Sequence, residues 1–360
     1  MNAYRTLVRP AAFLLPPETA HRVALWTLRR ARMWEALRPA FTFTDPALRQ
    51  RIGGLEFHNP VGVAPGFDKD GEALRGLACL GFGFLESGTV LPLPRAGNPG
   101  PRLLRYPEQE ALANCLGLPG RGVHGCAELL RRWSARGPVG VPVIVSFMGF
   151  TLDEYVRVFS ELQPWADALE VALRCPNTPD ERNFVDRDEF GTLLAALMEY
   201  KRKPVWVKLP SLDAEVDRQH LADLVEIGLR HGVDGFMVSG TRPIDEPRLS
   251  RGRGSLSGRP VLGRTLEAVG VVYRATRGRA PIVAQGGISS GADALAAIAS
   301  GANAVSVYTQ FVYDGPGLAS RINRELVALM RARGAGSIHD LCGCGPLSAD
   351  PAVRETASTG

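Results

Sequence analysis

The chain has 360 residues and a mass of 38.8 kDa, with 45% hydrophobic and 22% charged residues, so it can bury a large core and is neither disordered nor collagen-like. It lacks an uninterrupted apolar run of about 18 residues and a secretory signal pattern, so we expect no transmembrane helix and a cytoplasmic location. The net charge of +5 lies in residues 1–40, whereas residues 41–360 are formally neutral, so the pI of about 9.0 does not indicate nucleic-acid binding.

Residues 1–40 are predicted to form a basic, amphipathic helical extension. Apolar side chains such as Trp26 and Trp34 alternate with arginines, and Pro16-Pro17 separates short helical segments. Such a segment fits an anionic membrane surface, where each Arg contributes about 1 kcal/mol. Packing against the flank of the following domain is the alternative. The first interpretation places the protein peripherally on the inner face of the cell membrane.

Residues 41–335 are predicted to form one α/β domain. From residue 61 onward, short β-rich apolar runs alternate with segments of helical period, which is the pattern of parallel βα units. Each run is almost continuously hydrophobic, as strands covered on both faces must be. The eight runs are 61–64, 84–89, 142–146, 168–173, 204–209, 234–238, 281–285 and 303–308. Eight βα units predict a closed (β/α)8 TIM barrel.

The segments between the strands carry further signals. Thr151-x-x-Glu154 predicts a capping box at a helix start. The connections 90–141 and 239–280 are long, and we expect them to build or cover an active site, with surface decoration as the alternative. Residues 336–360 are predicted to be a C-terminal tail, small and polar from residue 346 and expected to be disordered.

Functional groups of a parallel barrel come from the C-terminal ends of its strands and the loops that follow. Those positions form a polar rim in this sequence. They are Lys69, Thr89, Ser146, Cys175, Asn177, Lys208, Ser239, Thr241, Gly286, Gly287, Tyr308 and Thr309. A glycine pair followed by a helix, next to a second loop after strand eight, is typical of a phosphate site. We therefore expect a phosphorylated ligand.

The rim residues leave more than one chemistry open. Lys69 and Lys208 could stabilise an anion, or one of them could form a Schiff base. Cys175 could be a nucleophile, a proton-transfer base or an inert buried thiol. Asp68 is the only carboxylate at the rim, no His lies there, and the six cysteines form no CxxC pair. Metal-dependent hydrolysis and Ser/His/Asp catalysis are therefore not supported, and no metal site is expected.

Several motifs occur together in one order. They are NPVGVAPGFDKDGEAL, LGFGFLESGTV, GNPGPRLLR, CPNTP, VKLP, LSGRP and QGGISSGADA. In this order and spacing the chain resembles the FMN-dependent dihydroorotate dehydrogenases, from the N-terminal extension to about residue 333. The extension and the segment PRLLRYPEQEAL resemble the class 2 branch, which is membrane-associated and reduces quinones. The resemblance implies oxidation of dihydroorotate in pyrimidine biosynthesis, with FMN as cofactor and a quinone as acceptor.

The resemblance also implies roles for individual residues. FMN would be held by Ala64, Gly66, Thr89, Ser146, Lys208, Ser239, Gly258, Gly287, Tyr308 and Thr309, with Lys208 near the flavin N1–C2 carbonyl. The substrate would face Lys69, Asn114, Asn177 and Thr241. Cys175 would be the base that removes a proton from C5 of dihydroorotate while a hydride leaves C6 for flavin N5.

Some positions depart from the family pattern. Class 2 members carry Ser as the base in a segment like NISSPNTP, whereas this chain reads ALRCPNTP with the cysteine of class 1. Ala172, Gly240 and Ser146 stand where the family has asparagines, and an NRMGFNN-type segment reads NCLGLPG. Each lost hydrogen bond costs roughly 0.5–1.5 kcal/mol, unless Arg174 or Thr241 compensates.

These departures keep alternatives open. A flavin enzyme of the same family with a different, non-orotate substrate would keep the cofactor residues and lose the substrate asparagines. A barrel lyase or isomerase would use Lys208 as a Schiff-base residue. A flavin-binding protein without turnover is a further alternative.

Overall fold

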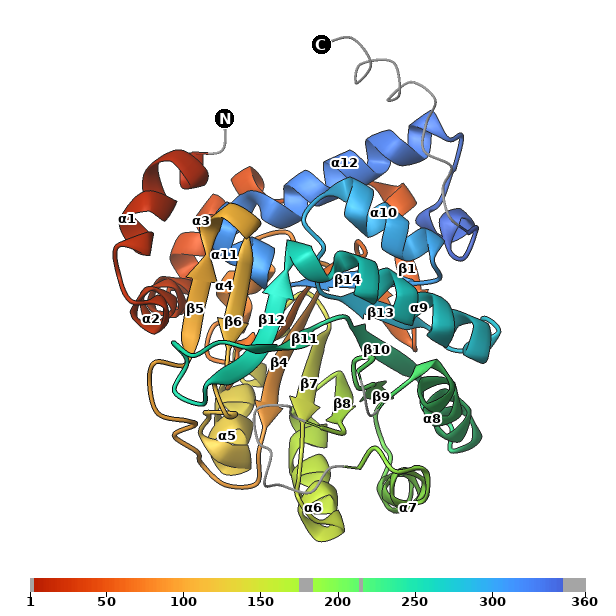
Figure 1. The fold of residues 1–360 in the computed structure, drawn as a ribbon. Coiled ribbons are helices and arrows are strands. Elements are labelled where there is room, and N and C mark those ends of the chain that lie inside the picture. Colours follow the sequence, from red (N-terminus) through yellow and green to blue (C-terminus); the bar gives the residue numbers. More distant parts are fainter. Residues whose placement is uncertain (1–2, 175–183, 214–215, 346–360) are drawn as a thin grey trace.

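The computed structural model describes residues 3–174, 184–213 and 216–345, whose fold is drawn in Figure 1. Eight parallel strands close a barrel, and β14 pairs with β3 to complete the ring, with Val305 opposite Val61. The strands are β3 (Val61–Asp68), β4 (Phe84–Val90), β7 (Val143–Phe147), β8 (Ala168–Ala172), β9 (Val205–Lys208), β10 (Gly235–Ser239), β13 (Ile282–Gln285) and β14 (Ala304–Val307). Each coincides with one of the eight apolar runs, so the predicted (β/α)8 barrel is confirmed.

Helices follow the barrel strands in turn and cover the outside of the barrel (Figure 1). They are α4 (Leu74–Ala78), α5 (Gly122–Ser134), α6 (Leu152–Leu162), α7 (Arg187–Met198), α8 (Arg218–Arg230), α9 (Leu262–Thr276), α10 (Gly291–Ala299), α11 (Thr309–Asp314) and α12 (Leu318–Ala332). Helix α6 begins with the predicted capping box. The Thr151 hydroxyl accepts from the Glu154 backbone N–H, and the Glu154 carboxylate accepts from the Thr151 N–H, each at 3.2 Å.

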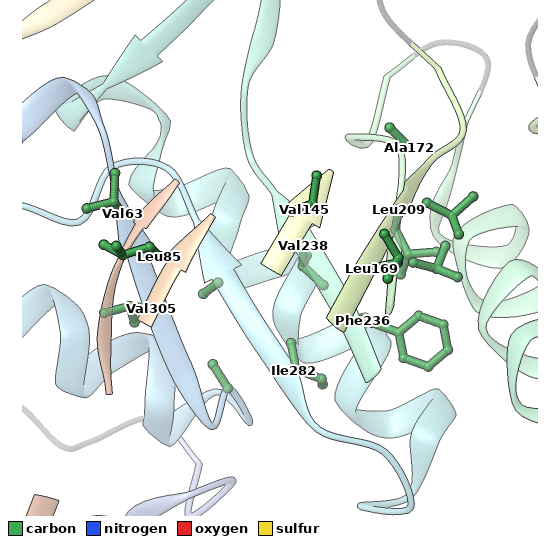
Figure 2. Packing of buried hydrophobic residues seen from close by; sticks show 14 of the residues in the cluster. Val63, Leu85, Val145, Leu169, Ala172, Leu209, Phe236, Val238, Ile282 and Val305 are labelled. Atoms are coloured by element: carbon green, nitrogen blue, oxygen red, sulfur yellow. The ribbon is translucent and has the colours of Figure 1, made fainter. Parts of the chain in front are cut away.

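The strand residues alternate between two environments. Figure 2 shows side chains such as Leu85, Val145, Leu169 and Val305 in the layer between barrel and helices. The alternate residues point into the barrel, where one apolar layer consists of Phe84, Ile144, Ala168, Trp206, Met237, Val283 and Ala304. Two residues further along, the inward positions are polar: Glu86, Ser146, Glu170, Lys208, Ser239, Gln285 and Ser306. The barrel interior therefore changes from an apolar to a polar layer over one step of each strand.

A short hairpin covers the N-terminal end of the barrel. Its strands are β1 (Gln50–Ile52) and β2 (Leu55–Phe57). The Phe57 ring stacks on Phe84 with centroids 4.6 Å apart, so the hairpin extends the apolar layer out of the barrel. The polar opening is therefore at the other end.

The two long connections pair with each other in an antiparallel sheet that the sequence did not predict. Its strands are β5 (Leu103–Tyr106), β6 (Ala111–Asn114), β11 (Arg242–Asp245) and β12 (Arg253–Gly258), in the order β11-β12-β6-β5. Strand β12 lies beside β6, with Ser255 opposite Asn114 and Gly258 opposite Ala111. One sheet therefore joins the loop after β4 to the loop after β10.

The N-terminal segment is helical and packs on the barrel. It consists of the turn η1 (Tyr4–Val8) and helices α1 (Arg9–Phe13), α2 (Pro17–Leu28) and α3 (Ala31–Phe41), which lie beside β5 and α4 (Figure 1). The predicted break at Pro16-Pro17 is the start of α2. Leu28 is buried, and Glu18 pairs with Arg102 of the barrel domain at 2.8 Å. Within the described ranges, no helix is long and apolar enough to span a membrane.

The first part of the predicted tail is ordered against the barrel. The turn η7 (Ile338–Leu341) buries Ile338 and Leu341, and the Gly343 N–H donates to the Ile298 carbonyl of α10 at 3.0 Å. Residues 346–360, for which disorder was expected, lie outside the described residues.

Candidate active site

A cavity of about 280 Å³ opens at the C-terminal ends of the barrel strands and collects the described candidates from the sequence. Those that line it are Ala64, Gly66, Lys69, Thr89, Asn114, Lys208, Ser239, Thr241, Gly258, Gly287, Tyr308 and Thr309. Ser146 is buried beneath them, with its hydroxyl 3.0 Å from that of Thr89. Cys175 and Asn177 lie outside the described residues. Strands β5, β6 and β12 supply part of the lining, so the long connections cover this site.

One wall of the cavity is a backbone cradle built from glycines. Gly258, Gly286 and Gly287 have φ values of 97°, 109° and 81°, which favour glycine. A Cβ on Gly287 would lie 2.5 Å from the Leu262 Cα, so the backbone here approaches its surroundings more closely than a side chain permits. The Thr309 hydroxyl lies 2.9 Å from that of Ser257 and adds hydroxyl groups to this wall. Exposed backbone N–H groups and hydroxyls are the donors that a phosphate requires.

Lys69 also lines the cavity and is half-buried. Its ammonium donates to the Gly66 carbonyl oxygen at 2.9 Å. Burial lowers the pKa of Lys69, and Asp70 opposes that shift. The neighbouring Asp68 carboxylate accepts from the backbone N–H groups of Glu72 and Ala73, each at 2.8 Å, and burial raises its pKa to about 6. Asp68 therefore fixes the loop that carries Lys69 rather than facing a ligand.

Two acidic side chains that are not among the rim positions lie close to the site. Glu86 and Glu170 are fully buried in the polar layer of the barrel that also contains Lys208. The Gln285 amide, which lines the cavity, donates to Glu86 at 2.6 Å. The expectation that Asp68 is the only carboxylate at the rim did not extend to these two glutamates, because they lie deeper in their strands than the rim positions.

The departures from the family pattern lie in this cavity or next to its lining residues. Ala172 lines it, and its carbonyl oxygen accepts from the Tyr155 hydroxyl at 2.7 Å. A Cβ on Gly240 would lie 2.5 Å from the Thr265 backbone nitrogen, so this position has no room for an asparagine. Arg174 lines the cavity as well and pairs with Asp213 at 2.6 Å. The cavity lining therefore includes a charged side chain, Arg174, as well as the small side chain of Ala172.

A second cavity of about 320 Å³ lies between the N-terminal helices and the barrel. It is lined by Glu18, His21, Arg22, Lys69, Arg102, Leu103, Leu116 and Tyr308, of which Lys69, Leu103, Leu116 and Tyr308 also line the first cavity. Burial, together with the charge of Lys69, lowers the pKa of His21 to about 4. From the sequence we expected no histidine at the rim, because we considered only positions that follow barrel strands. His21 belongs to α2, which is far from these strands in the sequence.

A closed parallel barrel with a glycine cradle and two half-buried lysines at the C-terminal ends of its strands is the architecture of a (β/α)8-barrel enzyme. The family model for dihydroorotate dehydrogenase matches residues 47–330. The chain belongs to this family and is an oxidoreductase.

Relatives cover nearly the whole chain. It is 37% identical over 346 residues to a dihydroorotate dehydrogenase (quinone) of Methylococcus capsulatus, covering 91% of this chain and 99% of the relative. It is 36% identical to a protein of the same name from Azorhizobium caulinodans, covering 94% and 98%. A ligand-free DHODH structure from Eimeria tenella superposes with a TM-score of 0.81 at 29% identity, covering 91% of this chain and 99% of that one. The same protein in complex with ferulenol gives a TM-score of 0.78, covering 91% and 95%.

Proposed function

We propose that this protein oxidises dihydroorotate to orotate in pyrimidine biosynthesis, with FMN as cofactor and a quinone as electron acceptor. One observation carries the proposal. The described residues that the family resemblance assigns to FMN and substrate gather at one cavity, and this cavity adjoins a second one beneath the N-terminal helices. Relatives of nearly the same length bear the name dihydroorotate dehydrogenase (quinone).

The cavity fits FMN. The glycines at positions 258 and 287 with Thr309 would hold the phosphate, because their backbone approaches closely and donates hydrogen bonds. Lys208 would face the flavin ring from the floor, and Tyr308 lies between the two cavities. The remaining contacts would come from Ala64, Gly66, Thr89, Ser146 and Ser239. When bound, FMN accepts a hydride from the substrate and passes electrons to the acceptor.

The chain's own residues orient the substrate and move its proton. Lys69 offers a half-buried ammonium to an anionic substrate, and Asn114 and Thr241, which also line the cavity, offer hydrogen bonds. We assign Asn177 to the substrate and the proton transfer from C5 to Cys175. We assign Arg174, which lines the cavity and pairs with Asp213, as the group that compensates for the amide lost at Ala172.

The quinone would bind in the second cavity. Its lining combines apolar Leu103 and Leu116 with the polar groups of His21 and Arg102. The low pKa of His21 keeps its ring neutral at pH 7, and Arg102 is paired with Glu18, so neither group adds an unbalanced charge where His21 can donate to a carbonyl oxygen of an uncharged ligand. Because Lys69 and Tyr308 line both cavities, the acceptor would lie next to the flavin.

The N-terminal helices would bring this cavity to a lipid surface. Eight of the ten exposed large apolar side chains of the described chain lie there: Leu7, Val8, Leu14, Leu15, Val23, Trp26, Met33 and Leu37. Arginines flank them, so we assign residues 1–40 as a peripheral membrane cap at the inner face of the cell membrane, residues 41–335 as the catalytic barrel and residues 336–360 as a tail.

The decisive experiment is anaerobic. The purified protein should be yellow, should release FMN on denaturation, and should lose its flavin absorbance when dihydroorotate is added. A quinone added afterwards should restore the absorbance. Bleaching by another dihydropyrimidine and not by dihydroorotate would transfer the proposal to the alternative substrate, and absence of flavin would overturn it.

A further inference from the structure

We propose that Glu86 and Glu170 share one proton inside the barrel and hold a single negative charge that balances Lys208 and thereby sets the reduction potential of the flavin. The last part of this inference rests on the proposed function, because it requires FMN above Lys208. The sharing of a proton is a property of the protein itself.

The two glutamates lie in the barrel's polar layer, directly beneath the cavity floor. Glu86 on β4 follows Phe84 of the apolar layer, and Glu170 on β8 follows Ala168 in the same way. Their exposed fractions are 1% and 0%. Water therefore cannot solvate either carboxylate, and each requires a partner within the protein.

The described partners are too few for two ionised carboxylates. Gln285 donates to one oxygen of Glu86, and the Ser306 hydroxyl also acts on this carboxyl as a hydrogen-bond partner, whereas both oxygens of Glu170 have no donor among the described residues. Two ionised carboxylates buried with so few donors would be very costly. A proton on one carboxyl converts it into a donor for the other, and their side chains lie within hydrogen-bonding reach. Burial, followed by the charge of Glu170, raises the pKa of Glu86 well above its ordinary value, whereas Lys208 and the Ser306 hydroxyl act in the opposite direction. A raised pKa is the direction expected when the pair retains a proton.

The charge that remains on the pair has a partner in Lys208. The Lys208 side chain comes from β9, which pairs with β8 so that Ala172 lies opposite Lys208, one inward step above Glu170. Its charge acts on the glutamate pair, and its side chain lines the cavity. One proton on the pair makes the three groups neutral together. Without the negative charge on the glutamate pair, Lys208 would stabilise negative charge on the flavin more strongly. The reduction potential of the flavin would then be higher.

Substitution by glutamine separates the possible charge states of the pair. We compare the flavin midpoint potentials of the wild type, Glu86→Gln, Glu170→Gln and the double variant. With one shared proton, each single variant keeps one charge, because the remaining glutamate ionises and accepts from the new amide, so its potential stays close to the wild-type value. The double variant loses the charge, and its potential rises. Two ionised glutamates would instead raise the potential in each single variant, and two protonated ones would leave all three unchanged; either result overturns the proposal.

Infrared spectroscopy tests the proton without any turnover. The difference spectrum between the wild type and either single variant should show the carbonyl stretch of one buried protonated carboxyl, present in the wild type alone. Its absence overturns the shared proton, even if the double variant does not fold. Glu226→Gln is the matched control, since it removes one exposed carboxylate from α8 and should change neither the band nor the potential. A protein that shows the band but is not reduced by dihydroorotate would count against the proposed function alone.

Discussion

The Thr265 hydroxyl fills the space beside Gly240 and donates to the carbonyl oxygen of Gly286 at 2.9 Å. Gly240 stands at a position where the family carries an asparagine. Because Gly240 has no side chain, Thr265 occupies this space and holds the glycine pair of the cradle through the Gly286 carbonyl. Thr265 is fully buried, and its backbone nitrogen lies 2.5 Å from the place of a Cβ on Gly240. The missing asparagine is thus part of a local repacking rather than an isolated loss.

This packing predicts a specific cost for a side chain at position 240. Gly240→Ala should lower the free energy of unfolding by about 1–3 kcal/mol, because the new methyl group overlaps buried atoms. Adding Thr265→Ala should restore only part of the loss, since the backbone atoms of Thr265 and Val261 remain within 2.5 and 2.8 Å. Urea unfolding of the two variants measures both values. Full recovery in the double variant would show that only the hydroxyl limits the space.

The assignment of Cys175 predicts a separation of binding from chemistry. Cys175→Ala should reduce the rate of flavin reduction by dihydroorotate about 10²–10⁴-fold, the range of general-base catalysis, while FMN content stays at the wild-type level. Cys175→Ser should retain part of the rate and require a higher pH, because the hydroxyl is less acidic than the thiol. Anaerobic stopped-flow absorbance measures the rate. Unchanged kinetics in the alanine variant would transfer the role of base to another residue.

The exposed apolar side chains of the extension predict reversible membrane binding. Leu14→Glu and Trp26→Glu should each weaken binding to anionic vesicles about tenfold or more, because burial of such a side chain contributes about 1.5–3 kcal/mol. Flavin content should not change. Tyr200→Glu, at an exposed position after α7, is the matched control and should bind as the wild type does. Vesicle co-sedimentation measures the effect, and equal binding by all three variants would favour a cap that only packs on the barrel.

His21 predicts a pH dependence of stability. Its ordinary pKa of 6.5 falls to about 4 in the fold, chiefly by burial. Between these values the unfolded chain binds a proton that the folded protein does not, so the contribution of His21 is complete above pH 6.5 and is lost as the pH falls toward 4. The slope approaches about 1.4 kcal/mol per pH unit. Asp68, with its pKa raised to about 6, acts in the opposite sense in the same range.

A variant isolates the histidine from Asp68. In His21→Asn the contribution of Asp68 remains, so the difference in unfolding free energy between wild type and variant should shrink as the pH falls through this window. Denaturant unfolding at several pH values gives this difference. A difference independent of pH would show that His21 is solvated and keeps its ordinary pKa.

The barrel strands could be predicted because each carries its own signal. A strand such as β7, buried along its whole length, must be apolar at consecutive positions whatever its neighbours are. Strands β5 and β11 carry no such signal, since their residues are half-buried or exposed and include Arg242 and Pro243. They are strands because β6 and β12 lie next to them, and this pairing joins chain segments that are far apart.

The candidate site shows the same limit. Rim residues such as Lys69 and Tyr308 could be located because they end a recognisable strand. Glu170 lies within a predicted strand, but the partner that gives it a role, Glu86, belongs to another strand and cannot be inferred from local pattern. His21 and Arg102 meet only because α2 packs across β5.

The pairing of β12 with β6 also bears on how the enzyme is made. Strand β6 leaves the ribosome long before β12, and β3 waits longer still for β14. Both early strands therefore expose unpaired edges during synthesis, a state prone to association with other chains. The cavity at the C-terminal ends of the strands forms only when these distant pairings form, so binding of the proposed FMN cannot assist folding of the incomplete chain. We therefore expect chaperones that shield strand edges to raise the yield of active enzyme in a heterologous host more than an abundant supply of cofactor does.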